Sequence, residues 1–214
     1  MQAAQIGATS PLIVRRLGLV DYATTYAAMR RFTSERKPHT PDELWLLQHS
    51  PVYTLGQAGK PEHLLYPTHV PVLSVDRGGQ ITYHAPGQIV VYTLLDLRRR
   101  GLHVRQTVSS LEQAIIDFLA SAGLVGERRV GAPGVYVKEA KIAALGLRVR
   151  NGCCYHGLAL NVDMALEPFA DINPCGYPGL AVTQLKNLGV NMNCDAAGEQ
   201  LAVQIARQLQ TRLE

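Results

Sequence analysis

The sequence predicts an α+β domain in which a mixed β-sheet is flanked by helices. The chain has 214 residues, of which 47% are hydrophobic and 18% charged, as expected for a compact fold with one sizeable core. Segments with helical spacing of apolar residues alternate with short apolar stretches of strand length. No repeat and no clear linker divides the chain. We therefore expect a single catalytic domain over residues 1–214, with a small satellite sheet beside the main one.

Three segments carry the helical pattern. Asp21 is a candidate N-cap for a helix whose apolar residues begin at Tyr22 and recur every three or four positions. The second helix is expected at about 104–122, where five apolar residues keep the same spacing. Asp195 is the expected cap of a last helix that runs to the C-terminus.

Short apolar stretches predict the strands. Residues 88–95 are largely apolar, so this strand is expected to be buried on both faces. Asn151-Gly152 is the strongest two-residue hairpin turn in the chain. The other expected strands cover 44–49, 52–55, 72–75, 134–137, 141–149 and 153–162, and long loops are expected at 56–69 and 167–180.

Composition excludes several classes of protein. No apolar stretch approaches the roughly 20 residues of a membrane helix, and residues 1–11 lack the pattern of an export signal. The four cysteines form no CxxC pair, which predicts reduced thiols in a cytoplasm and no zinc site or disulfide framework. The net charge is +4, and clusters such as 98–100 form either a solvated basic surface or a dock for acidic partners. No basic–aromatic motif supports nucleic-acid binding.

The densest polar segment is RGGQITYHAPGQ at 77–88. Its two adjacent glycines let the backbone approach a ligand closely, and Arg77, Thr82, Tyr83 and His84 supply polar groups of several types. It is neither a P-loop nor a dinucleotide fingerprint. The segment is a candidate binding loop, although a hairpin with a polar tip would have the same pattern.

Lys141 opens an apolar strand that reaches a glycine at 146. A lysine among apolar residues is partly desolvated, which favours its neutral form and lets it act as a base. The alternative is a lysine at the end of a strand that extends into water. The backbone N–H of Gly146 is a candidate donor to an oxyanion.

Cys175 lies between a proline and a glycine in a loop, where a thiol is more accessible than in a strand. It is therefore the candidate nucleophile, although a single loop cysteine is more often inert. Cys153 and Cys154 are expected in the core. A metal site formed by His84, His156 and Cys175 has no supporting ligand spacing, so no metal is expected.

Four segments together resemble the lipoyl(octanoyl) transferases, in the family's order and over nearly the whole chain. They are RGGQITYH with PGQ at 77–88, KIAALG at 141–146, HGLALNV at 156–162 and NPCGYPG at 173–179. The resemblance implies the fold of the biotin and lipoate protein ligases. It also implies transfer of an octanoyl or lipoyl group from an acyl carrier protein thioester to a lysine of a lipoyl domain or of glycine cleavage H protein. Ala85 departs from the family, which more usually has glycine there, and its methyl group is expected to narrow the pocket slightly.

The resemblance also implies roles for residues. Cys175 is expected to form the acyl-thioester intermediate, and Lys141 to activate the thiol and shuttle protons. A thioester is already activated, so no cofactor is expected, and neither are nucleic-acid or membrane partners; the protein is expected to be a monomer. The implied substrate-binding residues are Arg77, Gly78, Gly79, Gln80, Ile81, Thr82, Tyr83, His84, Ala144, Leu145, Gly146, His156, Gly157, Leu158 and Ala159.

Three other functions remain open at this point. An ATP-dependent lipoate ligase shares the implied fold but would bind an adenylate and need no cysteine. A thioesterase would use the same cysteine and lysine and pass the acyl group to water. A carrier-protein binding module without enzymatic activity would tolerate the loss of Cys175.

Overall fold

The computed structural model describes residues 11–214, without the side chain of Cys175. The expectation that residues 1–11 carry no export signal therefore falls almost wholly outside the described residues. Across residues 11–214, no helix combines the length and the apolar character that a membrane crossing requires.

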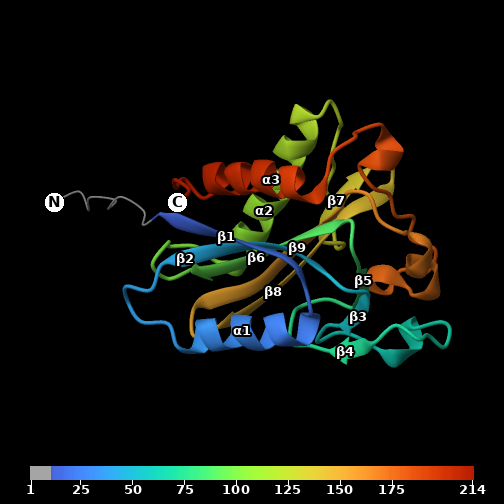
Figure 1. Ribbon diagram of the computed structural model, residues 1–214, viewed down its shortest axis with the longest axis horizontal. Helices are drawn as coiled ribbons and strands as arrows, with labels where there is room; N and C mark the ends of the chain where they lie inside the picture. Colours follow the sequence, from blue (N-terminus) through green and yellow to red (C-terminus); the bar gives the residue numbers. More distant parts are fainter. Residues whose placement is uncertain (1–10) are drawn as a thin grey trace.

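A six-stranded mixed sheet forms the centre of the molecule (Figure 1). Its strands lie in the order β1 (Leu12–Val20), β2 (Asp42–His49), β6 (Gln88–Asp96), β9 (Cys153–Asn161), β8 (Ala140–Arg150) and β7 (Gly134–Val137). β1 and β2 are parallel, and all other neighbours are antiparallel. This arrangement confirms the predicted mixed sheet.

Helices cover both faces of this sheet (Figure 1). α2 (Val104–Ser121) and α3 (Cys194–Gln208) lie on one face, and side chains such as Phe118 and Leu201 form the larger core there. α1 (Tyr22–Ser34) lies on the other face, where Met29 packs against Trp45 and Tyr92. The expected α+β class with flanking helices is thus confirmed.

A second, three-stranded sheet follows the order β4 (Val72–Ser74), β3 (Val52–Leu55) and β5 (Ile81–His84). It is the expected satellite sheet. Short 3₁₀ helices interrupt the loops, namely η1 (Pro61–His63), η2 (Glu167–Asp171), η3 (Pro174–Gly176) and η4 (Lys186–Leu188). η3, which contains Cys175, packs against β5.

The elements agree with the sequence in most places and differ in three. β5 (Ile81–His84) was not among the expected strands, because its residues were assigned to the binding loop. Asn151 and Gly152 adopt positive φ values of 51° and 73°, as the predicted hairpin turn requires. β1 was not expected, because its edge pairs with residues distant in sequence: Leu12 N donates to Arg212 O at 2.9 Å. The expected cap of the last helix was wrong. Asn193 Oδ1 accepts from Ala196 N at 2.8 Å, so the helix begins at Cys194 and Asp195 lies in its first turn.

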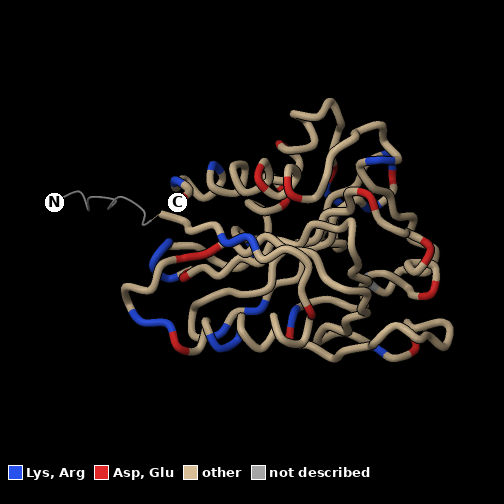
Figure 2. The backbone as a smooth tube through the Cα atoms, viewed as in Figure 1, with Lys and Arg blue, Asp and Glu red and all other residues tan. Residues whose placement is uncertain are grey.

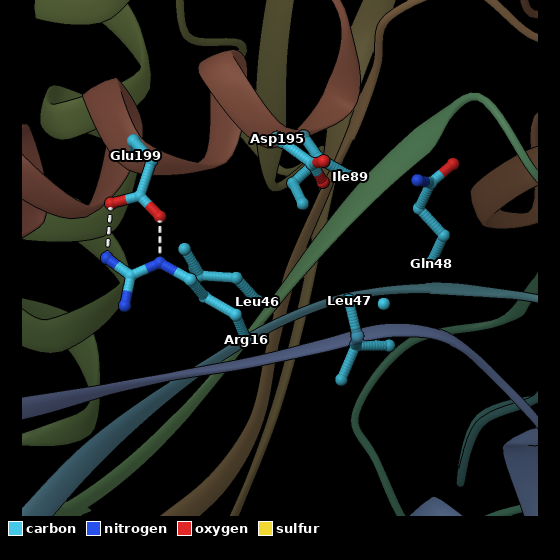
Figure 3. A pocket seen from close by; sticks show the side chains of 8 residues that line it. Arg16, Leu46, Leu47, Gln48, Ile89, Asp195 and Glu199 are labelled. Carbon is cyan, nitrogen blue, oxygen red and sulfur yellow. Dashed lines mark hydrogen bonds and ion pairs between the residues drawn. The ribbon is translucent and has the colours of Figure 1, made fainter.

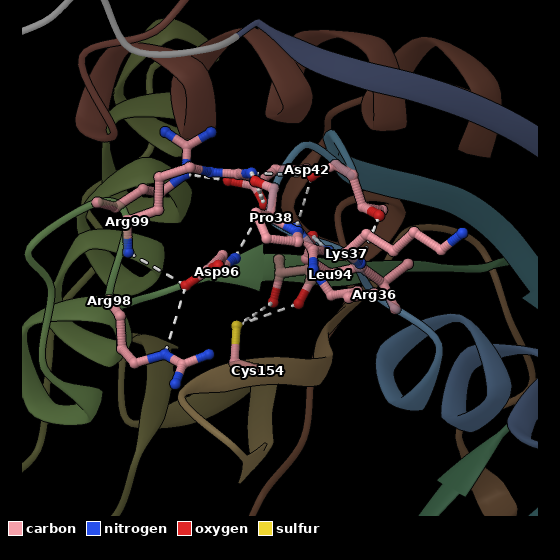
Figure 4. A network of polar contacts seen from close by, with 12 residues as sticks. Arg36, Lys37, Pro38, Asp42, Leu94, Asp96, Arg98, Arg99 and Cys154 are labelled. Carbon is pink, nitrogen blue, oxygen red and sulfur yellow. Dashed lines mark hydrogen bonds and ion pairs between the residues drawn. The ribbon is translucent and has the colours of Figure 1, made fainter.

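The arginine cluster at 98–100 is not simply a solvated basic surface. Arg99 and Arg100 both bind the fully buried carboxylate of Asp42, at 2.6 and 2.5 Å, and Arg36 binds the same carboxylate (Figure 4). Only Arg98 is largely exposed. Figure 2 shows that most charged residues lie on helices, loops and outer strands, whereas the middle of the main sheet is nearly free of them.

Candidate active site

A cavity on the α1 face of the main sheet brings the predicted binding segments together. Its floor is formed by paired residues of β8 and β9, such as Ala144 opposite Ala159 and Gly146 opposite Gly157. The loop before β5 and the strand itself form one wall, and Tyr22 of α1 contributes another. The cavity and the open space adjoining it measure about 520 Å³, and the lining is mostly apolar.

Thirteen of the fifteen predicted binding residues line this cavity. Gly78 lies outside it and donates its N–H to Leu147 O at 2.9 Å. Tyr83 also lies outside, because alternate residues of a strand face opposite sides; its ring packs against Tyr53 and Phe169. Ala85 belongs to the same apolar cluster as Tyr83, so its methyl group does not narrow the cavity.

Two glycines permit the close packing at the floor. A Cβ atom on Gly157 would lie 1.9 Å from Val91 O of the neighbouring strand. A Cβ atom on Gly146 would lie 3.0 Å from Gly78 O, so the binding loop rests directly on β8. Whether the N–H of Gly146 serves an oxyanion stays a prediction.

Arg77 holds the shape of the binding loop. Its guanidinium is buried and donates to Thr54 O at 2.6 Å, to Gln80 O at 2.8 Å and to Gly78 O at 2.9 Å. Strand β3 and the binding loop are thereby tied to one planar cation, which suits arginine because its five donors point in fixed directions.

A chain of buried polar side chains runs beneath the cavity. His84 Nδ1 lies 2.7 Å from Gln88 Oε1, and Gln88 Nε2 donates to Asn161 Oδ1 at 2.9 Å. Asn161 Nδ2 in turn donates to Thr183 O at 2.9 Å. Burial lowers the pKa of His84 to about 3, so the ring is neutral. The chain connects the binding loop to the segment that follows the cysteine loop.

Tyr22, His49 and Tyr92 form a second polar group at the cavity, and sequence analysis missed it. His49 Nε2 lies 2.7 Å from the hydroxyl of Tyr92, and burial lowers the pKa of His49 to about 4. Burial raises the pKa of Tyr22 to about 12. These residues belong to no local motif, and no signal short of the tertiary contacts could have grouped them.

Asp76 is a further site residue that sequence analysis missed, although it directly precedes the binding loop. Its carboxylate accepts from His156 Nε2 at 2.9 Å and from the Tyr155 hydroxyl at 2.5 Å. Burial alone would raise the pKa of Asp76, but the hydrogen bonds from His156, Tyr155 and Tyr26 outweigh burial and lower it. Asp76 is therefore ionised.

Lys141 is buried, with 4% of its surface exposed, so it does not extend into water. Its Nζ donates to Pro133 O at 2.8 Å and lies 5.5 Å from the centroid of the Tyr136 ring. Space for this side chain requires glycine at 134, where a Cβ atom would lie 2.5 Å from Lys141 Cε. The structure thus favours the desolvated lysine over the exposed one.

The backbone of the cysteine loop is placed at the cavity wall, while the side chain of Cys175 lies outside the described part of the structure. A Cβ atom on Gly176 would lie 3.5 Å from Gln80 Cγ and from His63 Nε2. A second hollow adjoins the cavity at Gln80 and Gly146, and Pro133 and Tyr177 line it. Pro133, whose carbonyl accepts from Lys141, and Tyr177, two positions after Cys175, therefore border the same hollow.

The other three cysteines are buried free thiols. Cys153 and Cys154 lie in the core, as expected, and burial raises the pKa of Cys154 to about 12. Burial likewise raises the pKa of Cys194 to about 11. None of the three has the accessible, activated environment of a reactive thiol.

A different hollow lies between α3 and the edge formed by β1 and β2 (Figure 3). An ion pair between Arg16 and Glu199 crosses it. It contains none of the catalytic or binding residues predicted from sequence.

The fold and the cavity define the class of protein as a lipoyl protein ligase A/B catalytic domain. The family with that description matches residues 21–206. Within this class the chain belongs to the octanoyltransferases, and it is therefore an acyltransferase. It is 59% identical over 199 residues to the octanoyltransferase of Dechloromonas aromatica, covering 93% of this chain and 97% of the relative. It is 64% identical over 184 residues to that of Thiobacillus denitrificans, covering 86% and 84%.

Solved structures confirm the fold predicted from the family resemblance. A lipoate-protein ligase A bound with ATP superimposes with a TM-score of 0.78 at 13% identity, covering 96% of this chain and 87% of that one. Biotin protein ligase from Aquifex aeolicus superimposes with a TM-score of 0.57 at 13% identity, covering 92% and 70%.

Proposed function

We propose that the protein transfers an octanoyl group, or a lipoyl group, from an acyl carrier protein thioester to a specific lysine of another protein. The proposed acceptors are the lipoyl domains of the E2 subunits of 2-oxoacid dehydrogenase complexes and glycine cleavage H protein. The reaction would be the first step of endogenous protein lipoylation. Membership of the octanoyltransferase family supports the acyl group and the reaction type.

One observation carries the proposed mechanism, namely how Lys141 is joined to the chain that leaves the cysteine loop. Lys141 N donates to Ala181 O at 2.8 Å, and Thr183 N donates to Lys141 O at 2.9 Å. The loop that starts at η3 therefore ends against the lysine, and its start lies against Gln80 of the cavity wall. This arrangement supports a nucleophile on the loop and a proton carrier at Lys141.

In the first half-reaction the Cys175 thiol gives its proton to Lys141 and attacks the carbonyl carbon of the donor thioester. The carbonyl re-forms, the bond to the carrier sulfur breaks, and the carrier leaves as a thiol with the proton from Lys141. The product is an octanoyl thioester on Cys175.

In the second half-reaction the acceptor amine attacks the acyl-enzyme. A free lysine amine is mostly protonated near neutral pH, so it must lose a proton, and Lys141 is the proposed base. The C–S bond then breaks. Of the two protons that the acceptor ammonium loses in forming the amide, one passes through Lys141 to the Cys175 thiolate and the other is released to solvent. An eight-carbon chain buried in the apolar cavity contributes on the order of 5 kcal/mol, at about 0.8 kcal/mol per methylene.

Intact mass measurement after mixing the protein with octanoyl carrier protein tests the intermediate. We expect one octanoyl adduct, located on Cys175 by peptide mapping and absent from the Cys175→Ser variant. An adduct on Cys153, Cys154 or Cys194 would contradict the assignment.

Adding an acceptor lipoyl domain separates the competing functions. We expect the acyl group to move to the acceptor lysine without ATP. Release of free octanoate at the same rate with or without acceptor would indicate a thioesterase. A requirement for ATP and free octanoate would indicate a ligase.

The proposal further places the protein in the cytoplasm as a monomer. The free thiols of Cys153, Cys154 and Cys194 fit a reducing compartment. Size-exclusion chromatography with light scattering would test the oligomeric state, and a dimer mass at micromolar concentration would contradict it.

A further inference from the structure

We propose that His156, held in place by Asp76, closes the acyl cavity at the end opposite Lys141 and sets the longest acyl chain that the enzyme accepts. The inference rests on the proposed function, because it requires the acyl chain to occupy this cavity.

The register of the sheet defines the two ends of the cavity. Along β8, Ala144, Leu145 and Gly146 pair with floor residues of β9, and Leu147 pairs with His156. Leu147 lies six residues beyond Lys141 along β8, so the floor of the cavity runs from the lysine end of the strand towards His156. An acyl chain whose carbonyl reacts beside Lys141 therefore points its tail towards His156.

His156 is held in a backbone conformation that is uncommon for a non-glycine residue within a strand. It has a φ of +61° within β9, in the left-handed region that most side chains avoid, although asparagine, aspartate and histidine enter it more often than others. Its N–H donates to Met29 Sδ at 3.1 Å, and its carbonyl accepts from Thr93 Oγ1 at 3.2 Å. Such strain persists only where the surroundings enforce it, and it gathers at functional sites.

The imidazole ring is also fixed from both sides. It stacks on the rings of Tyr26 and Tyr155, with centroid distances of 5.4 and 5.1 Å, and its Nε2 lies 2.9 Å from Asp76 Oδ1. Because Asp76 also accepts from the Tyr155 hydroxyl, one carboxylate orients two of the stacked rings. The wall is rigid as a result, so it does not yield to a longer chain.

The wall is polar as well as rigid. Burial lowers the pKa of His156, and Nε2–H donates to the ionised Asp76, so Nδ1 is a bare acceptor. The ring is almost fully buried and lines the cavity. An extra methylene pressed against this polar ring would meet it without offering a hydrogen bond, which disfavours longer chains.

A competition assay with octanoyl, decanoyl and dodecanoyl carrier proteins tests the proposal. His156→Gly suits the left-handed backbone and removes the wall, so the decanoyl-to-octanoyl ratio of kcat/KM is expected to rise by roughly tenfold or more. His156→Asn also tolerates this backbone and is shorter, so the ratio is expected to rise less. Lys138→Gly, at φ 46° in the turn before β8, is the control and should leave the ratio unchanged.

Variants of Asp76 test its positioning role. Asp76→Asn keeps an acceptor for His156 Nε2–H and should keep the wild-type ratio, whereas Asp76→Ala should raise it. If octanoyl transfer proceeds and the ratio stays within about twofold of wild type in His156→Gly and His156→Asn, the proposal is wrong. If His156→Gly does not fold, His156→Asn and Asp76→Ala decide the result. Failure of the wild-type protein to transfer octanoyl would instead overturn the proposed function.

Discussion

Lys141 is the residue on which both proposed half-reactions depend. Its burial is a consequence of three local choices: a glycine at 134, a carbonyl acceptor at Pro133 and the strand-like segment at 181–183 along its backbone. Each removes water from the amine or gives it a fixed direction. A buried amine so oriented is suited to carry a proton between a thiol and a second amine.

Variants of Lys141 should distinguish an electrostatic role of its charge from a role in proton transfer. Lys141→Ala should lower transfer by roughly 10²- to 10⁴-fold, because no general base remains. Lys141→Arg keeps the positive charge but stays protonated, so it should lose transfer as well. The measurement is single-turnover acyl transfer together with the pH dependence of Cys175 alkylation, with the exposed Lys60→Ala as control. Full transfer by Lys141→Arg would leave Lys141 only an electrostatic role.

Buried neutral histidines make stability depend on pH. The pKa of His49 falls from 6.5 to about 4 on folding because of burial. Between pH 4 and 6.5 the unfolded chain therefore binds more protons than the folded protein. The contribution of His49 to the free energy of unfolding is complete above pH 6.5 and is lost as the pH falls towards 4. Urea unfolding of wild type and His49→Gln should differ in slope by about 1.4 kcal/mol per pH unit in that window. Equal slopes would show that His49 stays solvated or protonated in the folded state.

The N-terminus of α3 shows how an element boundary depends on one side chain. Asn193 and Asp195 are both plausible caps by residue type, but only Asn193 has the extended backbone, with φ −87° and ψ 166°, from which its side chain reaches Ala196 N. Asp195 lies within the first turn, where its charge interacts with the helix dipole.

Two substitutions distinguish these roles. Asn193→Ala should lower the free energy of unfolding by about 1 kcal/mol, because Ala196 N–H loses its acceptor. Asp195→Ala should lower the free energy of unfolding by only about 0.3–0.5 kcal/mol, the contribution of an exposed charge that interacts with the helix dipole. Chemical denaturation of both variants checks the order, and a larger loss for Asp195→Ala would assign the cap to Asp195 after all.

Over the whole molecule, Asp42 joins segments that lie far apart in sequence (Figure 4). It is the first residue of β2, and its carboxylate forms ion pairs with Arg36 from the loop after α1 and with Arg99 and Arg100 from the turn after β6. Its Oδ1 also accepts from Asp96 N at 2.9 Å. One buried carboxylate thus balances several cations and fixes the end of the sheet remote from the small sheet.

Asp42→Asn should destabilise the protein by about 3–5 kcal/mol, because it leaves buried arginines without their counter-charge. The exposed Asp163→Asn, which removes a surface ion pair with Lys186, should cost less than about 1 kcal/mol. Urea unfolding measures both. Comparable losses for the two variants would mean that the cluster around Asp42 is hydrated and contributes little.

The local sequence pattern was sufficient to locate most secondary-structure elements and most of the binding residues. Helical spacing located α1 and α2, the Asn151-Gly152 pair located the β8–β9 turn, and four motifs located most of the cavity lining. It was insufficient for Tyr83, because a motif does not reveal which face of a strand its residues occupy; the ring turns away from the cavity. Strand alternation assigns the two faces only when one of them is known to be buried.

Every feature formed by residues distant in sequence could be recognised only in the folded structure. β1 pairs with the C-terminal residues, Asp76 meets His156 across 80 positions, and the backbone of Lys141 meets residues 181–183. Hydrogen bonds and desolvation act over a few ångströms in space, so no periodicity along the chain records them. For the same reason the sequence indicated a reactive lysine and a binding loop, whereas the burial of Lys141 and the wall at His156 became apparent only when the sheet brought their partners together.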